Sequence, residues 1–312
     1  TGVLDDHWGN RMVINGTTIK CENANSASGI LYAGSDITIK GVTQVGGNSL
    51  LGIRTDPMTL RGRVVIDDVK IISNSSAVDN FYVFGLSSIA SIVGKGDVMT
   101  VDPELPDYIY INNIDINVNS GKTLCIYRTP DIHVTYKEFS ELYIKDVNTN
   151  GANCIAFLSI CTGYSKTGTS KITIDNVNLN NGTSAYLAAA SNSTAITNKY
   201  SFVLNNVTNA SVRVAPAMLG SIDINGGSSY NINIDRGAWT AASPLVLHGV
   251  KMLGGSVNAN IVGAAFYNCN FAGTYTAFPA STNVTLIGCT KTVAQPALPT
   301  NITSNISAPY IA

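Results

Sequence analysis

Lys171–Leu179, with the sequence KITIDNVNL, decides the fold because versions of it recur along nearly the whole chain. The shared phrase is an apolar residue, any residue, Ile or Leu, a polar residue, then Asn, Asp or Gly, then a small apolar residue. The apolar residues that open the successive copies are Met12, Ile37, Val64, Ile109, Leu142, Ile172, Phe202, Ile232, Ala259 and Val284. Successive openings are separated by roughly 25–45 residues, and repeats of this length are typical of a solenoid.

The alternation inside the phrase predicts a β-strand followed by a tight corner. In the clearest copy Ile172 and Ile174 alternate with polar residues, which is the period of a strand with one buried face. The strand is followed by residues that tolerate a left-handed backbone. These corner residues are Gly16, Gly41, Asp68, Asn113, Asp146, Asn176, Asn206 and, less typically, Arg236. Since an apolar residue usually follows the corner, each copy predicts strand, two-residue corner, strand.

The predicted fold is all-β: a right-handed parallel β-helix of about ten coils with a short irregular C-terminal tail. No helical periodicity separates the copies, which excludes leucine-rich and ankyrin solenoids. The pattern resembles the right-handed parallel β-helix of the pectate-lyase-like polysaccharide enzymes and phage tailspikes. We expect residues 1–290 to form the β-helix, as a fragment of a longer one. Residues 291–312 contain three prolines, which favours a cap or a trimer-contacting tail.

Composition excludes several classes of function. Charged residues make up 12% of the chain and the net charge is −1, so the electrostatic footprint of a nucleic-acid-binding protein is missing. No apolar run approaches the roughly 18 residues of a membrane span, so we expect no membrane insertion. The six cysteines lack metal-ligand spacing and favour buried apolar packing over a disulfide framework. We therefore expect neither metal nor cofactor.

The strands that precede each copy predict a substrate-binding wall. Stacking Gly2–His7, Gly29–Gly34, Leu50–Asp56, Phe81–Leu86 and Leu124–Pro130 aligns their apolar positions, and acidic, basic and aromatic residues follow. The candidate substrate-binding residues are Trp8, Arg11, Tyr32, Arg54, Tyr127 and Arg128. The candidate catalytic residues are Asp5, Asp6, His7, Asp56 and Glu104. Rings would stack on sugar faces, while the arginine fork would bind carboxylates or hydroxyls.

Paired carboxylates favour hydrolysis of a polysaccharide. One carboxylic acid protonates the leaving oxygen and a second serves as base or nucleophile. Asp5 or Asp6 would pair with Asp56, or with Glu104 in the long insertion at residues 85–107. His7 would support a carboxylate or act as an acid or base itself. Each acid also has a structural interpretation, as a corner cap or half of a surface ion pair.

β-Elimination is an alternative on the same wall. It needs a cation to neutralise a uronate carboxylate and a base to remove the neighbouring proton. Arg54 or Arg128, together with His7, Tyr32 or Tyr127, would supply them. The residues alone leave the choice between hydrolase and lyase open.

The low-charge coils rich in Asn, Ser and Thr, together with the proline-bearing tail, look most like phage tailspikes. That resemblance implies a homotrimer on the virion tail that binds and cleaves bacterial capsule, exopolysaccharide or O-antigen; a secreted or cell-surface protein is the alternative location. The NTD, GHG and RIK signatures of polygalacturonases and the DPH signature of alginate epimerases are absent, so no catalytic residue is assigned by motif. A non-catalytic adhesin or receptor-binding rod is the rival function.

Overall fold

The structure of the chain is a computed structural model, and every helix or strand that it describes is a β-strand. The described residues are 2–6, 11–21, 28–32, 36–47, 49–53, 62–73, 80–86, 106–118, 123–128, 139–149, 156–160, 169–179, 186–189, 199–214, 219–234, 245–256, 264–273, 275–277 and 285–291. Within these segments no helix has the length and apolarity needed to cross a membrane. The expected tail at residues 291–312 lies outside them beyond Lys291.

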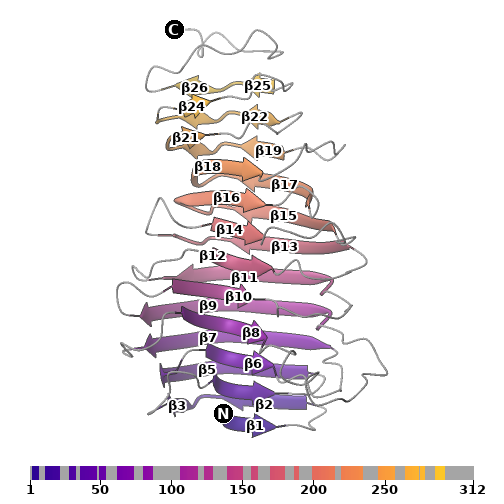
Figure 1. Cartoon of the computed structure of the whole chain (residues 1–312), viewed down its shortest axis with the longest axis vertical. Coiled ribbons are helices and arrows are strands. Elements are labelled where there is room, and N and C mark those ends of the chain that lie inside the picture. Colours follow the sequence, from indigo (N-terminus) through magenta and orange to yellow (C-terminus); the bar gives the residue numbers. More distant parts are fainter. Residues whose placement is uncertain are drawn as a thin grey trace, which may run out of the picture.

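Two large parallel sheets contain nearly all of the described strands (Figure 1). Sheet A runs in the order β1 (Gly2–Asp6), β4 (Ser28–Tyr32), β6 (Ser49–Ile53), β8 (Asn80–Leu86), β10 (Thr123–Arg128), β12 (Ala156–Ile160), β14 (Tyr186–Ala189), β16 (Ala210–Val214), β18 (Ser228–Ile234), β20 (Lys251–Met252), β23 (Asn270–Phe271) and β26 (Thr290–Lys291). Sheet B runs in the order β2 (Arg11–Asn15), β5 (Asp36–Gly46), β7 (Arg63–Ser73), β9 (Tyr108–Val118), β11 (Glu141–Asn148), β13 (Thr169–Asp175), β15 (Lys199–Asn205), β17 (Leu219–Asn225), β19 (Leu245–His248), β22 (Ala265–Tyr267) and β25 (Thr285–Ile287), and β3 (Thr18–Cys21) also pairs with β5. A small sheet pairs β21 (Gly255–Ser256) with β24 (Tyr275–Ala277).

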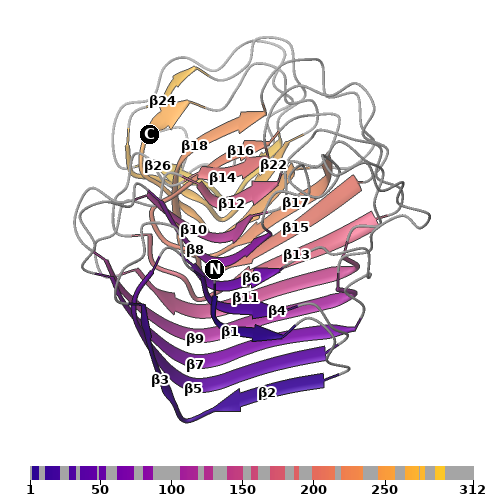
Figure 2. The ribbon, with the colours of Figure 1, turned by 60° about the horizontal axis from the view of Figure 1, so that its bottom comes forward.

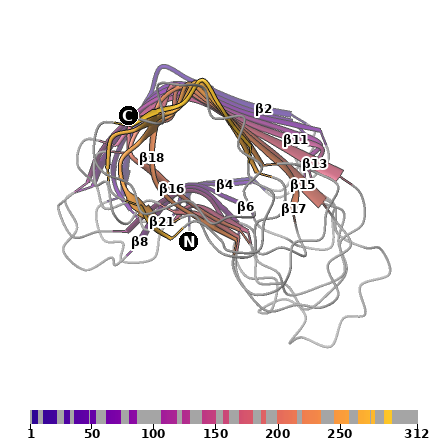
Figure 3. The same ribbon diagram turned by 90° about the horizontal axis from the view of Figure 1, so that it is seen from above.

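The chain visits the two sheets alternately and adds one strand to each as it advances. Each strand pairs in parallel with the preceding and the following strand of its own sheet, and we call each such step a rung. Figure 2 shows the strands of sheet B lying side by side from β2 to β17, and Figure 3, seen along the stack, shows successive strands overlying one another. The prediction of an all-β chain of parallel strands is confirmed, and the topology is compatible with a parallel β-helix.

A continuous column of buried aliphatic and aromatic residues runs through the described length of sheet B. Its residues occupy the third position of the repeated phrase, where alternation places the side chain on the inner face. The column consists of Ile14, Ile39, Ile66, Ile111, Ile144, Ile174, Leu204, Ile224, Leu247, Phe266 and Leu286, all buried. Fully burying one such side chain contributes about 1.5–3 kcal/mol, so the stacked column is a main source of folding free energy.

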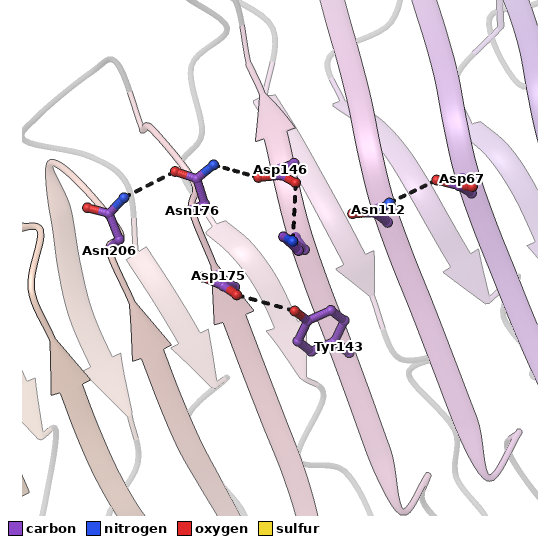
Figure 4. Close-up of polar contacts among 8 residues, drawn as sticks. Asp67, Asn112, Tyr143, Asp146, Asp175, Asn176 and Asn206 are labelled. Atoms are coloured by element: carbon purple, nitrogen blue, oxygen red, sulfur yellow. Dashed lines mark hydrogen bonds and ion pairs between the residues drawn. The ribbon is translucent and has the colours of Figure 1, made fainter.

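The corners confirm the repeat over the first two thirds of the chain. All seven of the Gly, Asn and Asp corner residues predicted between Gly16 and Asn206 have φ between 50° and 60°. This left-handed backbone costs Asn and Asp little, and it costs glycine less. Amide and carboxylate side chains near the corners also bridge rungs (Figure 4): Asn112 donates to Asp67 at 2.9 Å, and Asn206 donates to Asn176 at 3.1 Å.

The predicted copy opening at Ile232 is wrong, and the one opening at Ala259 lies outside the described residues. The residue in register with Phe202 is Ile222, and the corner that follows it is Gly226 with φ 66°, in place of Arg236. From Leu204 the inner column continues to Ile224, Leu247, Phe266 and Leu286, at shorter steps than those between the earlier copies. Ile232 instead lies in β18 of sheet A, where Ile-x-Ile imitates the phrase. Shorter repeats therefore fit one more rung than the sequence predicted.

The described cysteines confirm the prediction of buried packing. Cys21, Cys269 and Cys289 are buried free thiols. Cys289 follows the corner Gly288, at the place in the repeat where earlier copies carry valine. Burial raises the pKa of the Cys21 thiol, which is the behaviour of an inert packing residue.

Acid should weaken the bridge between Lys40 and Asp67. Burial alone would raise the pKa of Asp67, but the Asn112 amide and the Lys40 ammonium, 3.1 Å from Oδ2, together hold it below its usual value. A carboxyl group whose pKa is lower in the folded state stabilises the fold above its unfolded pKa of about 3.9 and loses that contribution as the pH falls through the folded pKa. Asp67→Asn should therefore remove part of the acid sensitivity of the wild-type protein, by less than about 1 kcal/mol because the pair is partly exposed.

Urea unfolding at two values of pH, one on each side of the carboxyl titration, measures this difference. Asp223→Asn, on the same face of sheet B, controls for the loss of one negative charge. Equal acid sensitivity in Asp67→Asn and wild type would contradict the assignment.

Candidate functional site

The sheet A strands that carry the predicted wall lie beside one another. Strand β1 pairs with β4, and β4 with β6, so that Asp6, Tyr32 and Ile53 occupy one register position. The neighbouring position contains Asp5, Leu31 and Gly52. The backbone thus brings the carboxyl ends of β1, β4 and β6 to one edge of sheet A.

The Asp5 register position continues for several rungs. Beyond Gly52 it contains Gly85 of β8, Arg128 of β10 and Ser159 of β12. It lies one residue beyond the buried column that includes Ile30 and Leu51, and Leu50, one residue before Leu51, is also buried. Two successive glycines, Gly52 and Gly85, separate its acidic and basic ends, and glycine in a strand allows a ligand to approach the backbone closely.

The prediction that Tyr127 binds substrate is wrong. Its side chain has 0% exposure and contacts Phe139 edge-on, with ring centroids 5.4 Å apart. Tyr127 is in register with Phe84 and Leu158, on the inner side of the strand alternation. The preceding residue, Ile126, is also 0% exposed, so this part of β10 is buried at two successive positions.

The other predicted site residues are separated from this column or lie outside the described part of the chain. Arg11 is exposed in β2 and is in register with Asp36, so it belongs to sheet B and not to the sheet A wall. The side chains of Asp5, Asp6, Tyr32 and Arg128 are not among the described ones, although their strands are. The predictions for His7, Trp8, Arg54, Asp56 and Glu104 fall outside the described residues.

A group of residues that the sequence reasoning missed lies on the outer face of sheet B. Three successive strands, β9, β11 and β13, each present three outward positions before the corner. We call these nine residues the tyrosine face; they are Tyr108, Tyr110, Asn112, Glu141, Tyr143, Lys145, Lys171, Thr173 and Asp175. Rungs are about 4.8 Å apart and alternate residues about 6.7 Å apart, so the nine positions form a compact grid.

The tyrosines of this face are held in place by their neighbours. The rings of Tyr110 and Tyr143 lie with centroids 6.2 Å apart at 55°. Tyr143 donates its hydroxyl hydrogen to Oδ2 of Asp175 at 3.2 Å, across one rung, as Figure 4 shows. Burial, followed by the nearby Asp175 carboxylate, raises the pKa of Tyr143, which keeps it a hydrogen-bond donor. Tyr108 stays 45% exposed.

The charges of the tyrosine face balance. Glu141 and Asp175 oppose Lys145 and Lys171, and Asn112 adds an uncharged hydrogen-bonding group, whereas Thr173 is buried beneath its neighbours with 8% exposure. Within the described segments no three His, Cys, Asp or Glu residues gather in a way that could hold a metal ion. The arrangement offers aromatic surface together with both donors and acceptors.

The signal for the tyrosine face is present in the sequence. Tyr108–Asn112 reads YIYIN and Glu141–Lys145 reads ELYIK, in which tyrosines occupy positions that alternate with buried aliphatic residues. The polar positions of the phrase itself, once stacked, show tyrosines in two successive copies. In the sequence we aligned only the strands that precede each copy, and these tyrosines lie in the copies themselves.

The described strands form large parallel sheets, with Asp5 and Asp6 in β1 of sheet A and the tyrosine face on sheet B. No family model, curated protein or solved structure matches this chain. The resemblance to pectate-lyase-like enzymes and tailspikes accordingly stays a prediction.

Proposed function

We propose that the chain is a right-handed parallel β-helix of the phage tailspike kind that binds bacterial capsule, exopolysaccharide or O-antigen and cleaves it internally as a glycoside hydrolase. The observation that carries this proposal is the register of β1, β4 and β6, which assembles the ends of three strands that are far apart in sequence into one wall. A long polymer needs such a continuous wall. As part of the proposal, the protein is a homotrimer on the virion tail or is secreted.

Depolymerisation of purified bacterial surface polysaccharides tests the reaction. We expect the polymer to shorten in size-exclusion chromatography, with a rise in reducing ends and no ultraviolet absorbance from unsaturated ends. Absorbing ends would reject hydrolysis in favour of elimination. The absence of any shortening would leave the rival, a non-catalytic adhesin, as the better account.

Asp5→Asn or Asp6→Asn should abolish cleavage while binding is retained. Asp5 and Asp6 are adjacent in β1 and occupy opposite alternation positions, so we expect a large loss for one of the two variants and a small loss for the other. Removing a positioned acid or base costs about 10²–10⁴-fold in rate. Asp56→Asn tests its partner, and Asp223→Asn on sheet B is the control. Full cleavage activity in all three acid variants would overturn the assignment of these carboxylates.

A further inference from the structure

We propose that the tyrosine face is a second glycan-binding surface, which holds a neutral stretch of polysaccharide on sheet B while the wall of sheet A carries out cleavage. The inference rests on the proposed function for the class of ligand, and it adds a site on a different sheet. Its position follows from the register of β9, β11 and β13, and it does not depend on the catalytic residues.

The chemistry of the face fits a sugar. Tyrosine combines a flat apolar ring with a polar hydroxyl group, and carbohydrates present both C–H faces and hydroxyls. Tyr108 is one of three large hydrophobic side chains that are exposed among the described residues, and the other two, Val13 and Ile287, lie on β2 and β25. The exposed aromatic ring of Tyr108 thus lies on the same face as the hydrogen-bond donors and acceptors.

The charge balance selects a neutral ligand. Two lysines and two carboxylates occupy the nine positions, and Asp67 and Asp146 lie directly beside them, so the face has no positive excess to attract a polyanion such as nucleic acid. A protein partner is less favoured, because Tyr108 is exposed but Tyr110 and Tyr143 are half-buried, so the three rings do not form a large apolar patch. Mixed charges and amides instead hydrogen-bond to hydroxyl groups in either direction.

The face is also pre-organised. The hydrogen bond from Tyr143 to Asp175 and the contact between Tyr143 and Tyr110 order two of the rings before a ligand arrives. Ordering a side chain on binding costs about 0.5–1.5 kcal/mol, so rings that are already fixed bind at lower entropic cost. The ring spacing of 6.2 Å is on the scale of a pyranose unit, which allows neighbouring sugars to contact neighbouring rings.

Affinity electrophoresis of the full chain tests the proposal. The gels contain purified neutral O-antigen polysaccharides, or polysialic acid as the anionic probe. Tyr108→Ala should weaken retardation by neutral polymers about tenfold, on the scale of one lost aromatic contact. Tyr143→Phe, which keeps the ring and removes its bond to Asp175, should weaken it two- to fivefold. Tyr267→Ala is the control, since Tyr267 stacks on His248 at 4.9 Å on the same sheet, outside the tyrosine face.

Cleavage of short oligosaccharides, measured in parallel, separates the two proposals. Weaker binding of the neutral polymer with unchanged cleavage of short substrates supports the tyrosine face. The proposal is overturned if both variants bind like wild type, or if the wild-type protein is retarded by polysialic acid alone or by no gel. It is also overturned if the variants change the oligomeric state in sedimentation, because the face would then be a contact between copies of the chain. Failure of the proposed function would give a different result: the wild-type protein would bind the polymer without shortening it.

Discussion

Replacing Gly227 with alanine should destabilise the folded chain by about 3–5 kcal/mol, because a left-handed backbone and a steric clash add together. Gly227 has φ 70°, and a Cβ atom at this position would lie 2.1 Å from the backbone oxygen of Val207 on the preceding rung. That oxygen accepts a hydrogen bond from the amide of Ser228 at 3.0 Å, so it is not free to move away. Denaturant unfolding measures the loss.

The adjacent glycine is a matched control for this prediction. Gly226 has φ 66°, but nothing lies within 4 Å of its hypothetical Cβ. Gly226→Ala should therefore cost only about 1–2 kcal/mol, the backbone term alone. Gly226→Asn should cost less, since Asn206 occupies the same corner position one rung earlier with φ 51°. If the two alanine variants lose the same stability, the close approach of the rungs at Val207 is wrong.

Phe139→Ala should cost about 3–5 kcal/mol through the cavity that it leaves in the core. The Phe139 side chain is 1% exposed and lies between two other buried rings, with centroids 5.4 Å from Tyr127 and 6.3 Å from Tyr200. The edge-on contact with Tyr127 adds about 0.5–1.5 kcal/mol beyond the buried area. Urea unfolding of the variant should show a clearly lower midpoint with a similar slope.

Two further variants show whether the loss of stability in Phe139→Ala comes from a cavity in the core. Phe139→Leu keeps most of the apolar volume and should recover a large part of the stability. Tyr110→Ala removes a ring from the outer face and should cost about 1 kcal/mol or less, as surface substitutions usually do. A cost for Phe139→Ala as small as that of Tyr110→Ala would contradict the buried cluster around Tyr127.

Local patterns predicted strands and corners well because each is decided by a few adjacent residues. A strand with one buried face must alternate, as Ile172 and Ile174 do, and a left-handed corner selects Gly, Asn or Asp, as at Asn176. All seven Gly, Asn and Asp corners predicted up to Asn206 have the expected backbone. The parallel, all-β character of the described chain followed from the same two signals.

The errors arose where the outcome depends on how many residues lie between the strands. Ile232 and Ile234 satisfy the phrase, yet they belong to sheet A because the repeat becomes shorter after Leu204. The alternation pattern does not state which sheet a strand joins. Tyr127 failed for a different reason: two successive residues of its strand, Ile126 and Tyr127, are both buried, which a simple alternation does not predict.

The candidate site was predictable only in part. The register that aligns β1, β4 and β6 follows from apolar positions, so the sequence could place their acidic and aromatic residues on one sheet. The tyrosine face depends on the register of β9, β11 and β13, which the copies opening at Ile109, Leu142 and Ile172 already predict, but the polar positions of those copies were not compared. Once that register is known, Tyr108, Tyr110 and Tyr143 come together without further assumptions.

The central claim is that the strands of sheet B stack in one continuous register from Asn15 to Ile287, and a single distance tests it. The two residues are ten rungs apart in the same column, so spin labels on Asn15→Cys and Ile287→Cys should lie about 48 Å apart, from rungs of about 4.8 Å. The measurement is made by double electron–electron resonance on the labelled chain, with the native cysteines replaced and magnetically dilute protein. A narrow distribution near that distance is the predicted result. A distance well below about 40 Å, or a broad distribution, would contradict the stacking, since fewer or irregular rungs would then separate the two ends.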